Sequence, residues 1–320
     1  MAYIAKIAIA GTTALMMTAP AAAITVNATE DPTTLVNNIL GAGVSIVGTP
    51  TFTKGAASGF DDGPTIQAGS FTAGTDAVPF ASGIVLGTGS VAAIPGANTD
   101  SGLPEAIPGG GNDGPGTNDF SANNLTHAVE NITDTSATTG ITDSRDFAML
   151  EFQFQFGDGS GGGDIFFNFS FASEEYLDFV DSAFNDEFQL LINGVNLGTT
   201  TGSVGGDPIN INSVNPNSNA GLYVNNVQNT EGVPDNNLAF GFDGRTTGIT
   251  ANANALGAGV HTAQFIIADV GDGLLDSGVF IQGGTFANTS TPVADVPAPA
   301  ALGLLGLGLG LVAARRRRKG

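Results

Sequence analysis

The chain has 320 residues, of which 42% are hydrophobic and only 12% are charged, and its formal net charge is −21. This hydrophobic content is enough for a buried core and argues against wholesale disorder, while the absence of cysteine excludes disulfides, thiolate metal sites and a cysteine nucleophile. All thirty Asp and Glu residues lie between Glu30 and Asp295, where only Lys54, Arg145 and Arg245 are basic, so we expect no nucleic-acid binding because such a chain repels phosphate groups.

The first 23 residues have the layout of a secretory signal peptide. Lys6 precedes an apolar run over residues 7–17, and the segment ends in the small residues 21–23. We therefore predict cleavage after Ala23, which leaves residues 24–290 as the folded part of the exported protein. The alternative for this segment is a short buried helix.

One short helix is predicted near the start of the folded part, and a second one further along. Asp31 and Pro32 are residues that begin helices, and Gly41 is one that ends them. Residues 119–130 carry apolar side chains four apart, which is the spacing of another short helix. The apolar side of the first helix is formed by Leu35, Val36, Ile39 and Leu40.

The clearest strands lie in the middle of the chain. Apolar residues alternate with polar ones over residues 147–156, and residues 165–171 repeat this alternation with phenylalanine at every second position from Phe167. The glycine-rich residues 157–163 between them predict a flexible turn, since the lysine and the following helix of a phosphate-binding loop are missing. We predict an antiparallel hairpin whose phenylalanines share one core.

Further short strands are predicted along the whole chain. Residues 188–192 and 195–197 flank Asn193-Gly194, a strong signal for a two-residue hairpin turn. Turn residues recur about every eight to twelve positions, which is typical of a single all-β domain built as an antiparallel β-sandwich, with a jelly roll among the candidate topologies. The other predicted strands are residues 70–72, 83–86, 209–211, 238–242, 260–270 and 279–286.

The densest chemistry is the acidic stretch over residues 171–196. It holds six carboxylates within fourteen residues and no Lys or Arg. Such a group repels itself in a folded core, so the stretch predicts either a solvated loop or a cation site. A second acidic group follows the strand at 260–270.

The chain has no Cys and only two His, the residues that Zn²⁺ prefers. Oxygen ligands on loops therefore favour Ca²⁺ over Zn²⁺. We therefore predict a Ca²⁺ site between the two acidic segments. The alternative is that these acids cap turns through backbone N–H groups and keep the protein soluble. The predicted ligands are Glu174, Glu175, Asp178, Asn185 and Asp186 from the first segment, and Asp269, Asp272 and Asp276 from the second.

The C-terminal end has the three parts of a sorting signal. A short motif, Val296-Pro297-Ala298-Pro299-Ala300, precedes an apolar run to Ala314 and then a basic cluster over residues 315–319. As a helix, residues 298–314 extend roughly 25 Å, at the lower limit for crossing a bilayer, and the basic cluster stays cytoplasmic. We therefore predict a linker and motif at residues 291–297, and a transmembrane segment with a basic tail at residues 298–320.

This tail resembles the PEP-CTERM sorting signals of the VPxPA variant. It has Ala298 where the name-giving motif has Glu. The resemblance implies that an exosortase of a Gram-negative envelope processes the protein. Before processing, the apolar segment anchors the protein transiently in the inner membrane.

Several blocks of the chain also resemble the choice-of-anchor L domain of bacterial surface proteins. The two most specific are the sequences FASEEY and DVGDGLLDSGVF, and the resemblance covers about residues 24–286. It implies an exported, surface-attached β protein and brings no known enzymatic activity. The blocks are residues 171–176, 185–188, 212–215, 242–247 and 268–280.

The catalytic residue types are sparse. Neither His127 nor His261 lies near a serine in a nucleophile-elbow sequence, and adjacent Glu174 and Glu175 would face opposite sides of a strand, not one cleft. We expect no enzyme but a structural or adhesive component of the cell envelope or extracellular matrix, with exopolysaccharide or other surface proteins as partners.

The alternative is a carbohydrate-active enzyme or lectin acting on exopolysaccharide. The chain has no tryptophan and only three tyrosines, so it lacks the usual aromatic platform for sugar rings. Glycan binding and reducing-sugar release distinguish the two hypotheses.

Overall fold

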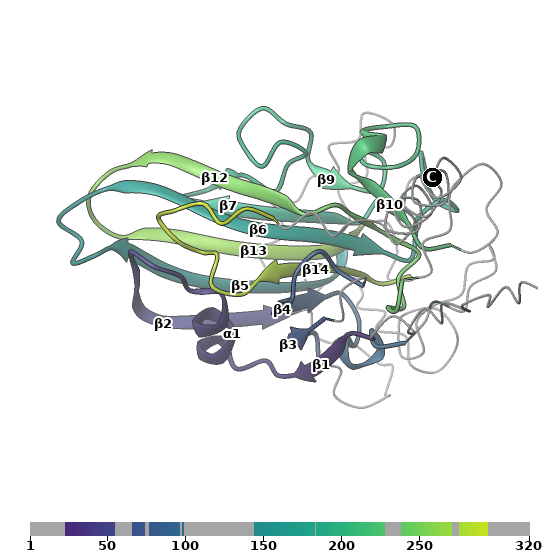
Figure 1. Cartoon of the computed structure of the whole chain (residues 1–320), viewed down its shortest axis with the longest axis horizontal. Helices are drawn as coiled ribbons and strands as arrows, with labels where there is room; N and C mark the ends of the chain where they lie inside the picture. The colour runs from purple at the N-terminus through teal and green to yellow at the C-terminus, as the bar shows by residue number, and fades with distance from the viewer. Residues whose placement is uncertain are drawn as a thin grey trace, which may run out of the picture.

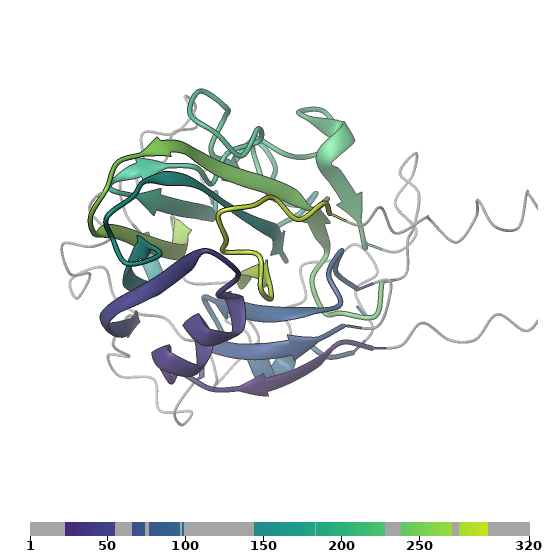
Figure 2. The ribbon, with the colours of Figure 1, turned by 60° about the vertical axis from the view of Figure 1, so that its left-hand side comes forward.

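Two antiparallel sheets pack face to face as a sandwich in the computed structural model, which describes residues 23–54, 66–73, 77–96, 98, 144–182, 184–227, 238–270 and 275–293 (Figures 1 and 2). The predicted β-sandwich is confirmed. The eight-stranded sheet has the order β1 (Thr25–Ala28), β3 (Ala68–Thr72), β4 (Ser82–Gly87), β14 (Ser277–Gln282), β6 (Gly163–Ser173), β11 (Gly244–Thr246) and β10 (Tyr223–Asn225), and β12 (Ile249–Leu256) also pairs with β6.

The six-stranded sheet forms the second layer. Its order is β2 (Val44–Lys54), β5 (Ser144–Phe156), β13 (His261–Val270), β7 (Glu187–Ile192) and β8 (Val195–Asn196), and β9 (Ile209–Asn210) also pairs with β7. The described helical segments are α1 (Pro32–Ile39) and two 3₁₀ turns, η1 (Val91–Ala93) and η3 (Ala220–Leu222). The predicted Asn193-Gly194 turn is confirmed, because Ile192 pairs with Val195 and both turn residues have positive φ.

The main core lies between the sheets and is lined by every second residue of the strands. From one sheet, β6 contributes Phe167, Phe169 and Phe171, and from the other sheet β5 and β13 contribute Phe152, Phe154 and Phe265. Helix α1 adds Leu35, Val36 and Ile39 to the same core, which confirms its predicted apolar side.

The predicted hairpin between residues 147–156 and 165–171 is wrong. Strand β5 pairs with β2 and β13, whereas β6 lies in the other sheet and pairs with β14, β11 and β12. Residues 157–162 therefore cross from one sheet to the other. The phenylalanines do share one core, because a period of two predicts which face is buried but not which strand lies alongside.

Residues 238–242 do not form the predicted strand. The side chain of Asn226 takes the place of a neighbouring strand: its Nδ2 donates to the carbonyl oxygens of Phe240 and Phe242 at 3.0 and 2.7 Å, and its Oδ1 accepts from Leu238 N at 2.6 Å. The rings of Phe240 and Phe242 then pack against Phe280 on the outer face of the eight-stranded sheet. An amide side chain therefore satisfies backbone groups that a sheet would otherwise pair.

The last predicted strand, residues 279–286, ends earlier than expected. Strand β14 stops at Gln282, and a turn with Gly284 at φ +70° carries Phe286 back into the main core. The backbone oxygen of Phe286 accepts a hydrogen bond from Gly41 N, just beyond α1, at 2.9 Å. A Cβ on Gly41 would lie 2.3 Å from Gly284 O, so this contact requires glycine.

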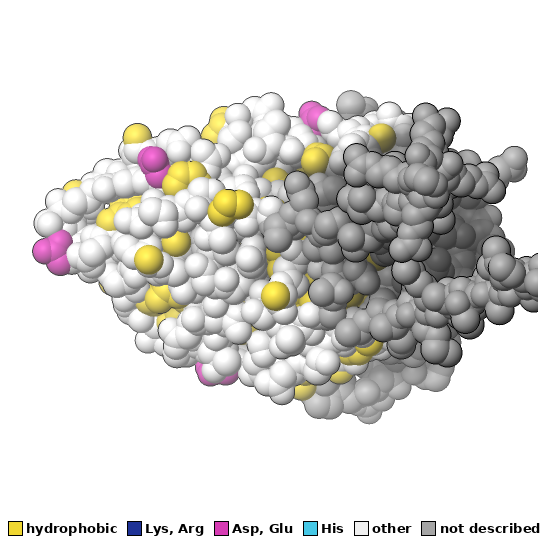
Figure 3. Space-filling model, viewed as in Figure 1, with side chains coloured by type: hydrophobic (Ala, Val, Ile, Leu, Met, Phe, Trp, Pro, Cys, Tyr) yellow, Lys and Arg dark blue, Asp and Glu magenta, His cyan; other side chains and the backbone are white. Residues whose placement is uncertain are grey.

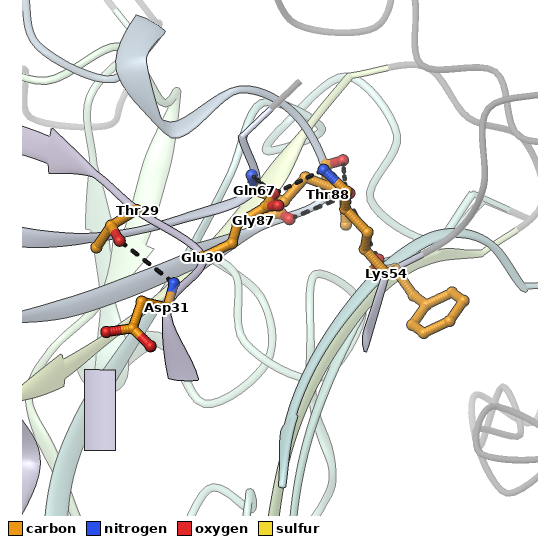
Figure 4. Close-up of polar contacts among 8 residues, drawn as sticks. Thr29, Glu30, Asp31, Lys54, Gln67, Gly87 and Thr88 are labelled. Atoms are coloured by element: carbon orange, nitrogen blue, oxygen red, sulfur yellow. Dashed lines mark hydrogen bonds and ion pairs between the residues drawn. The ribbon is translucent and has the colours of Figure 1, made fainter. Parts of the chain in front are cut away.

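An ion pair connects the two sheets near the N-terminal strand (Figure 4). Lys54 Nζ at the end of β2 lies 2.7 Å from Glu30 Oε1, which also accepts from Gln67 N at 2.9 Å. Both charged side chains are about one-third exposed or less, at 32% and 27%. An ion pair of this kind contributes at most about 1 kcal/mol to the stability of the fold.

Several predicted segments lie outside the described residues: the signal peptide up to residue 22, the second helix at 119–130, the sorting motif at 296–300 and the transmembrane segment at 298–320. Within the described ranges, no helix has the length and apolar character needed to span a membrane.

Asp31 gives α1 a pH-dependent cap. Its carboxylate accepts hydrogen bonds from the backbone of Thr33 and Thr34, and the bond from the Thr34 hydroxyl is the main cause that lowers the pKa of Asp31. The native carboxyl therefore binds its proton less tightly than the unfolded one. The cap stabilises the fold above the ordinary pKa of Asp, and this stabilisation is lost as the pH falls through the lowered pKa.

We expect Asp31→Asn to be less stable than the wild type at pH 7, with a difference that shrinks towards pH 3 or below. Chemical denaturation at several pH values measures this difference. A gap between the two proteins that grows in acid contradicts the expectation.

Candidate functional site

Six of the eight predicted ligand residues gather at one end of the sandwich, where strands of both sheets begin or end. In the eight-stranded sheet β6 ends at Ser173, which is paired with Ser277 at the start of β14. In the other sheet β7 begins at Glu187, which is paired with Ala268 near the end of β13. We call this end the acidic end and define it as Glu174, Glu175, Asn185, Asp186, Asp269 and Asp276.

Asp186 connects the two acidic segments through its side chain. Its Oδ1 accepts from the backbone N–H of Val270 at 3.1 Å, and its Oδ2 accepts from the Ser277 hydroxyl at 2.7 Å. Asp186 comes from the stretch before β7, whereas its two partners lie at the end of β13 and the start of β14. This carboxylate therefore joins the two sheets at the acidic end.

The backbone of the acidic stretch is joined to the second segment as well. Glu174 N donates to Asp276 O at 3.1 Å, and Asn185 N donates to Val270 O at 3.2 Å. Within the acidic stretch itself, Glu175 Oε2 accepts a hydrogen bond from Asp186 N at 3.4 Å. The structure therefore brings together the two loops that the sequence predicts as one site.

Asp276 meets a third loop that sequence reasoning missed. The Thr88 hydroxyl lies 3.4 Å from Asp276 Oδ1 and accepts from Ser277 N at 2.9 Å. A Cβ on Gly89 would lie 1.8 Å from Asp276 Oδ2, so the loop after β4 approaches the carboxylate closely. No sequence signal near Thr88 marks this role, since the contact spans almost two hundred residues and depends on the pairing of β4 with β14.

The acids of the acidic end are buried, not solvated. Their exposed fractions are 1% for Glu174, Glu175 and Asp186, 3% for Asp276 and 0% for Asp269. Two predicted ligands differ: Asp178 is exposed, and Asp272 lies in residues 271–274, outside the described part. On the face shown in Figure 3, acidic side chains are few and well separated.

Tyr176 anchors the acidic stretch in the main core. Its ring is fully buried and lies 6.2 Å from Phe171 and 4.9 Å from Tyr223, measured between ring centroids. Burial, and secondarily the neighbouring Tyr223, raises the pKa of Tyr176 well above its ordinary value, so the phenol stays neutral. A Cβ on Gly244 would lie 2.8 Å from this ring, so glycine is needed beside it.

The Asp186 carboxylate, with its hydrogen bonds to Val270 and Ser277, forms a clamp between the two acidic segments. Buried carboxylates are tolerated where they accept hydrogen bonds, and Asp186 accepts two. Among the residues that the structure describes, no group of three or more acids or histidines is placed to hold a metal ion. The hydrogen bond from Val270 N to Asp186 is of the kind that the turn-capping interpretation expects.

Two family models match the chain, and together they extend from residue 24 to residue 319. The first is the choice-of-anchor L domain, over residues 24–287, and the second is the PEP-CTERM protein-sorting motif, over residues 295–319. No curated protein and no solved structure matches the chain. The sorting motif implies an exported, cell-surface sorted protein that an exosortase processes. Since the first match covers most of the chain and the sandwich that bears the acidic end, this protein belongs to the choice-of-anchor L domain family.

Proposed function

We propose that the sandwich is a non-catalytic structural or adhesive component of the cell envelope or extracellular matrix of a Gram-negative bacterium. The observation that carries this proposal is the position of the sorting motif next to the folded domain. Val293 packs against the sandwich, since a Cβ on Gly248 would lie 2.4 Å from Val293 Cγ1, and the motif begins two residues later.

Hydrogen bonds at Ala287 and Thr291 hold the segment after strand β14 against the domain. Ala287 exchanges backbone hydrogen bonds of 2.8 and 3.0 Å with Phe166, and Thr291 O accepts from Asn168 Nδ2 at 2.8 Å. The four residues from 294 to 297 reach at most about 14 Å when extended. The folded sandwich therefore ends within a few residues of the sorting motif, which suits a protein whose function is to be displayed.

Processing at both ends of the chain tests the delivery. We expect the surface-extracted protein to begin at Ile24 and to lack the tail Arg315–Lys319, because the first segment is typical of a signal peptide and the second follows the sorting motif. The intact mass of the extracted protein shows whether both ends have been cleaved. Protein from cells lacking the exosortase provides the comparison. Surface protein that retains its basic tail contradicts exosortase sorting.

Delivery alone does not distinguish a structural from a catalytic role. Deleting the gene is expected to weaken surface attachment or matrix cohesion, and the purified exported protein is expected to release no reducing sugar from the exopolysaccharide of its own cells. Such release overturns the non-catalytic proposal and leaves sorting intact.

We also propose that Ca²⁺ binds where the two acidic loops meet. The support is that the backbone N–H groups of Glu174 and Asn185 and the carboxylate of Asp186 contact residues on either side of residues 271–274, whose sequence contains the predicted ligand Asp272. Ca²⁺ takes about 6 to 8 oxygen ligands, which carboxylates and backbone carbonyls on such loops supply. A cation that binds only the folded state raises the free energy of unfolding of the protein.

The expected result is a higher melting temperature of the exported protein in millimolar Ca²⁺ than in EDTA, by several degrees, with a smaller shift for Mg²⁺. Asp272→Ala should remove most of this shift, whereas Asp207→Ala changes an exposed acid outside the predicted ligand set and serves as the control. Equal shifts with both cations leave the acids as a hydrogen-bonded clamp only.

A further inference from the structure

A pocket of about 550 Å³ lies on the six-stranded sheet, away from the main core. Its floor is the outer face of β7, where Gln189 and Leu191 point away from the core-facing Phe188 and Leu190. Strand β8 and the loop of residues 199–208 form its walls. This volume is within the range of about 300–1,000 Å³ that is typical of small-ligand sites.

Two glutamines of the pocket are oriented by carboxylates. Gln189 Nε2 donates to Glu187 Oε1 at 2.8 Å, and Gln264 Nε2 donates to Glu151 Oε2 at 2.7 Å. A carboxylate only accepts, so the nitrogen of each amide must face it. The oxygen of the half-buried Gln264 therefore points elsewhere, and within the described residues it makes no hydrogen bond.

Asn196 supplies the opposite polarity. Its Oδ1 accepts from Leu190 N at 3.1 Å and from Gly198 N at 2.8 Å, which settles the orientation of the amide. Its Nδ2 is therefore a donor, and within the described part of the chain it makes no hydrogen bond. The pocket thus offers one oriented acceptor and one oriented donor, both neutral.

The rim of the pocket is apolar. Val195 and Val204 line it and are 46% and 73% exposed, and they are two of the three large hydrophobic side chains exposed in the described ranges. The third, Val260, is 50% exposed and is not part of the pocket. None of the residues that line the pocket is Lys, Arg or His, so it lacks the groups that bind anions.

We propose that this pocket binds a neutral saccharide unit. Hydroxyl groups both donate and accept, so they match Gln264 Oε1 and Asn196 Nδ2 together, and the C–H face of a sugar ring can cover the exposed valines. The missing cationic groups and the buried Glu187, which also lines the pocket, disfavour acidic sugars and phosphorylated ligands. This inference rests on the proposed adhesive function and names its ligand class, and it joins that function to the lectin alternative without catalysis.

The test is titration of the exported protein with four neutral disaccharides, cellobiose, maltose, lactose and N,N′-diacetylchitobiose, and with glucuronic acid as the anionic comparison. Ligand-observed NMR detects weak binding, including the millimolar dissociation constants that a few hydrogen bonds provide. We expect saturable binding of at least one neutral disaccharide and none of glucuronic acid. No saturable binding by any neutral disaccharide, or preferred binding of glucuronic acid, overturns the proposal.

Three variants place the binding in this pocket. Asn196→Asp keeps the acceptor oxygen for Leu190 and Gly198 but replaces the donor, so affinity should fall about tenfold or more. Val204→Ser should weaken binding several-fold, whereas the matched Val260→Ser should leave it unchanged. Equal affinity of Asn196→Asp and the wild type overturns the assignment.

Binding and delivery are measured separately. The titration uses purified protein and does not depend on where the cell places it, so a failure to bind leaves the sorting result untouched. Conversely, Asn196→Asp is expected to be processed and displayed at the wild-type level.

Discussion

Asp186→Ala is expected to lower the free energy of unfolding by about 2–4 kcal/mol. The substitution leaves the backbone N–H of Val270 and the hydroxyl of Ser277 buried without their acceptor, and both residues are at most 2% exposed. Each buried donor that loses its partner costs about 1–3 kcal/mol, and release of a buried charge offsets part of the sum. Urea denaturation of the exported protein measures the change.

Matched variants separate this role from general acidity. Asp186→Asn keeps an oxygen for Val270 N and offers Ser277 a donor, so we expect a loss of about 1 kcal/mol. Asp181→Asn removes an exposed charge of the same segment, at a positive φ that asparagine tolerates, and should stay within about 0.5 kcal/mol of the wild type. A double-mutant cycle with Ser277→Ala should show coupling, and if Asp186→Ala proves as mild as Asp181→Asn, the clamp interpretation is wrong.

Phe286→Ala is expected to destabilise the fold by about 3–5 kcal/mol. The Phe286 ring is fully buried, and its centroid lies 4.9 Å from that of Phe154 and 5.1 Å from that of Phe152, both in near-perpendicular contact. It also lies 5.9 Å from the Phe167 ring of the opposite sheet, so its removal leaves a cavity between the layers. Thermal and urea denaturation report the loss.

Two control variants test this explanation: a conservative substitution at the same position and a substitution at an exposed position. Phe286→Leu fills part of the space and should cost clearly less than alanine. Val260→Ala changes a side chain that is 50% exposed and should have little effect. A small effect of Phe286→Ala, comparable with that of Val260→Ala, shows that the segment after β14 is not part of the core.

Local sequence patterns were sufficient for features that depend on neighbours in the chain. Asp31, Pro32 and the spacing of Leu35, Val36 and Ile39 predict α1, because a helix is closed by bonds between residues four apart. Alternation along residues 147–156 predicts a buried face, and Asn193-Gly194 predicts its hairpin, since both depend on short-range geometry. The two family resemblances are likewise carried by short blocks of residues.

Partners distant in the chain were decided only by the tertiary structure. Alternation could not show that β5 and β6 lie in opposite sheets, because every antiparallel neighbour satisfies the same pattern. The residues around Asn226 gave no sign that its amide would replace a strand beside Phe240, and nothing near Thr88 predicted its contact with Asp276. The acidic residue types were visible in the sequence, but their burial and their bonds across the sandwich arise from the ends of four strands meeting at one place, which no local pattern contains.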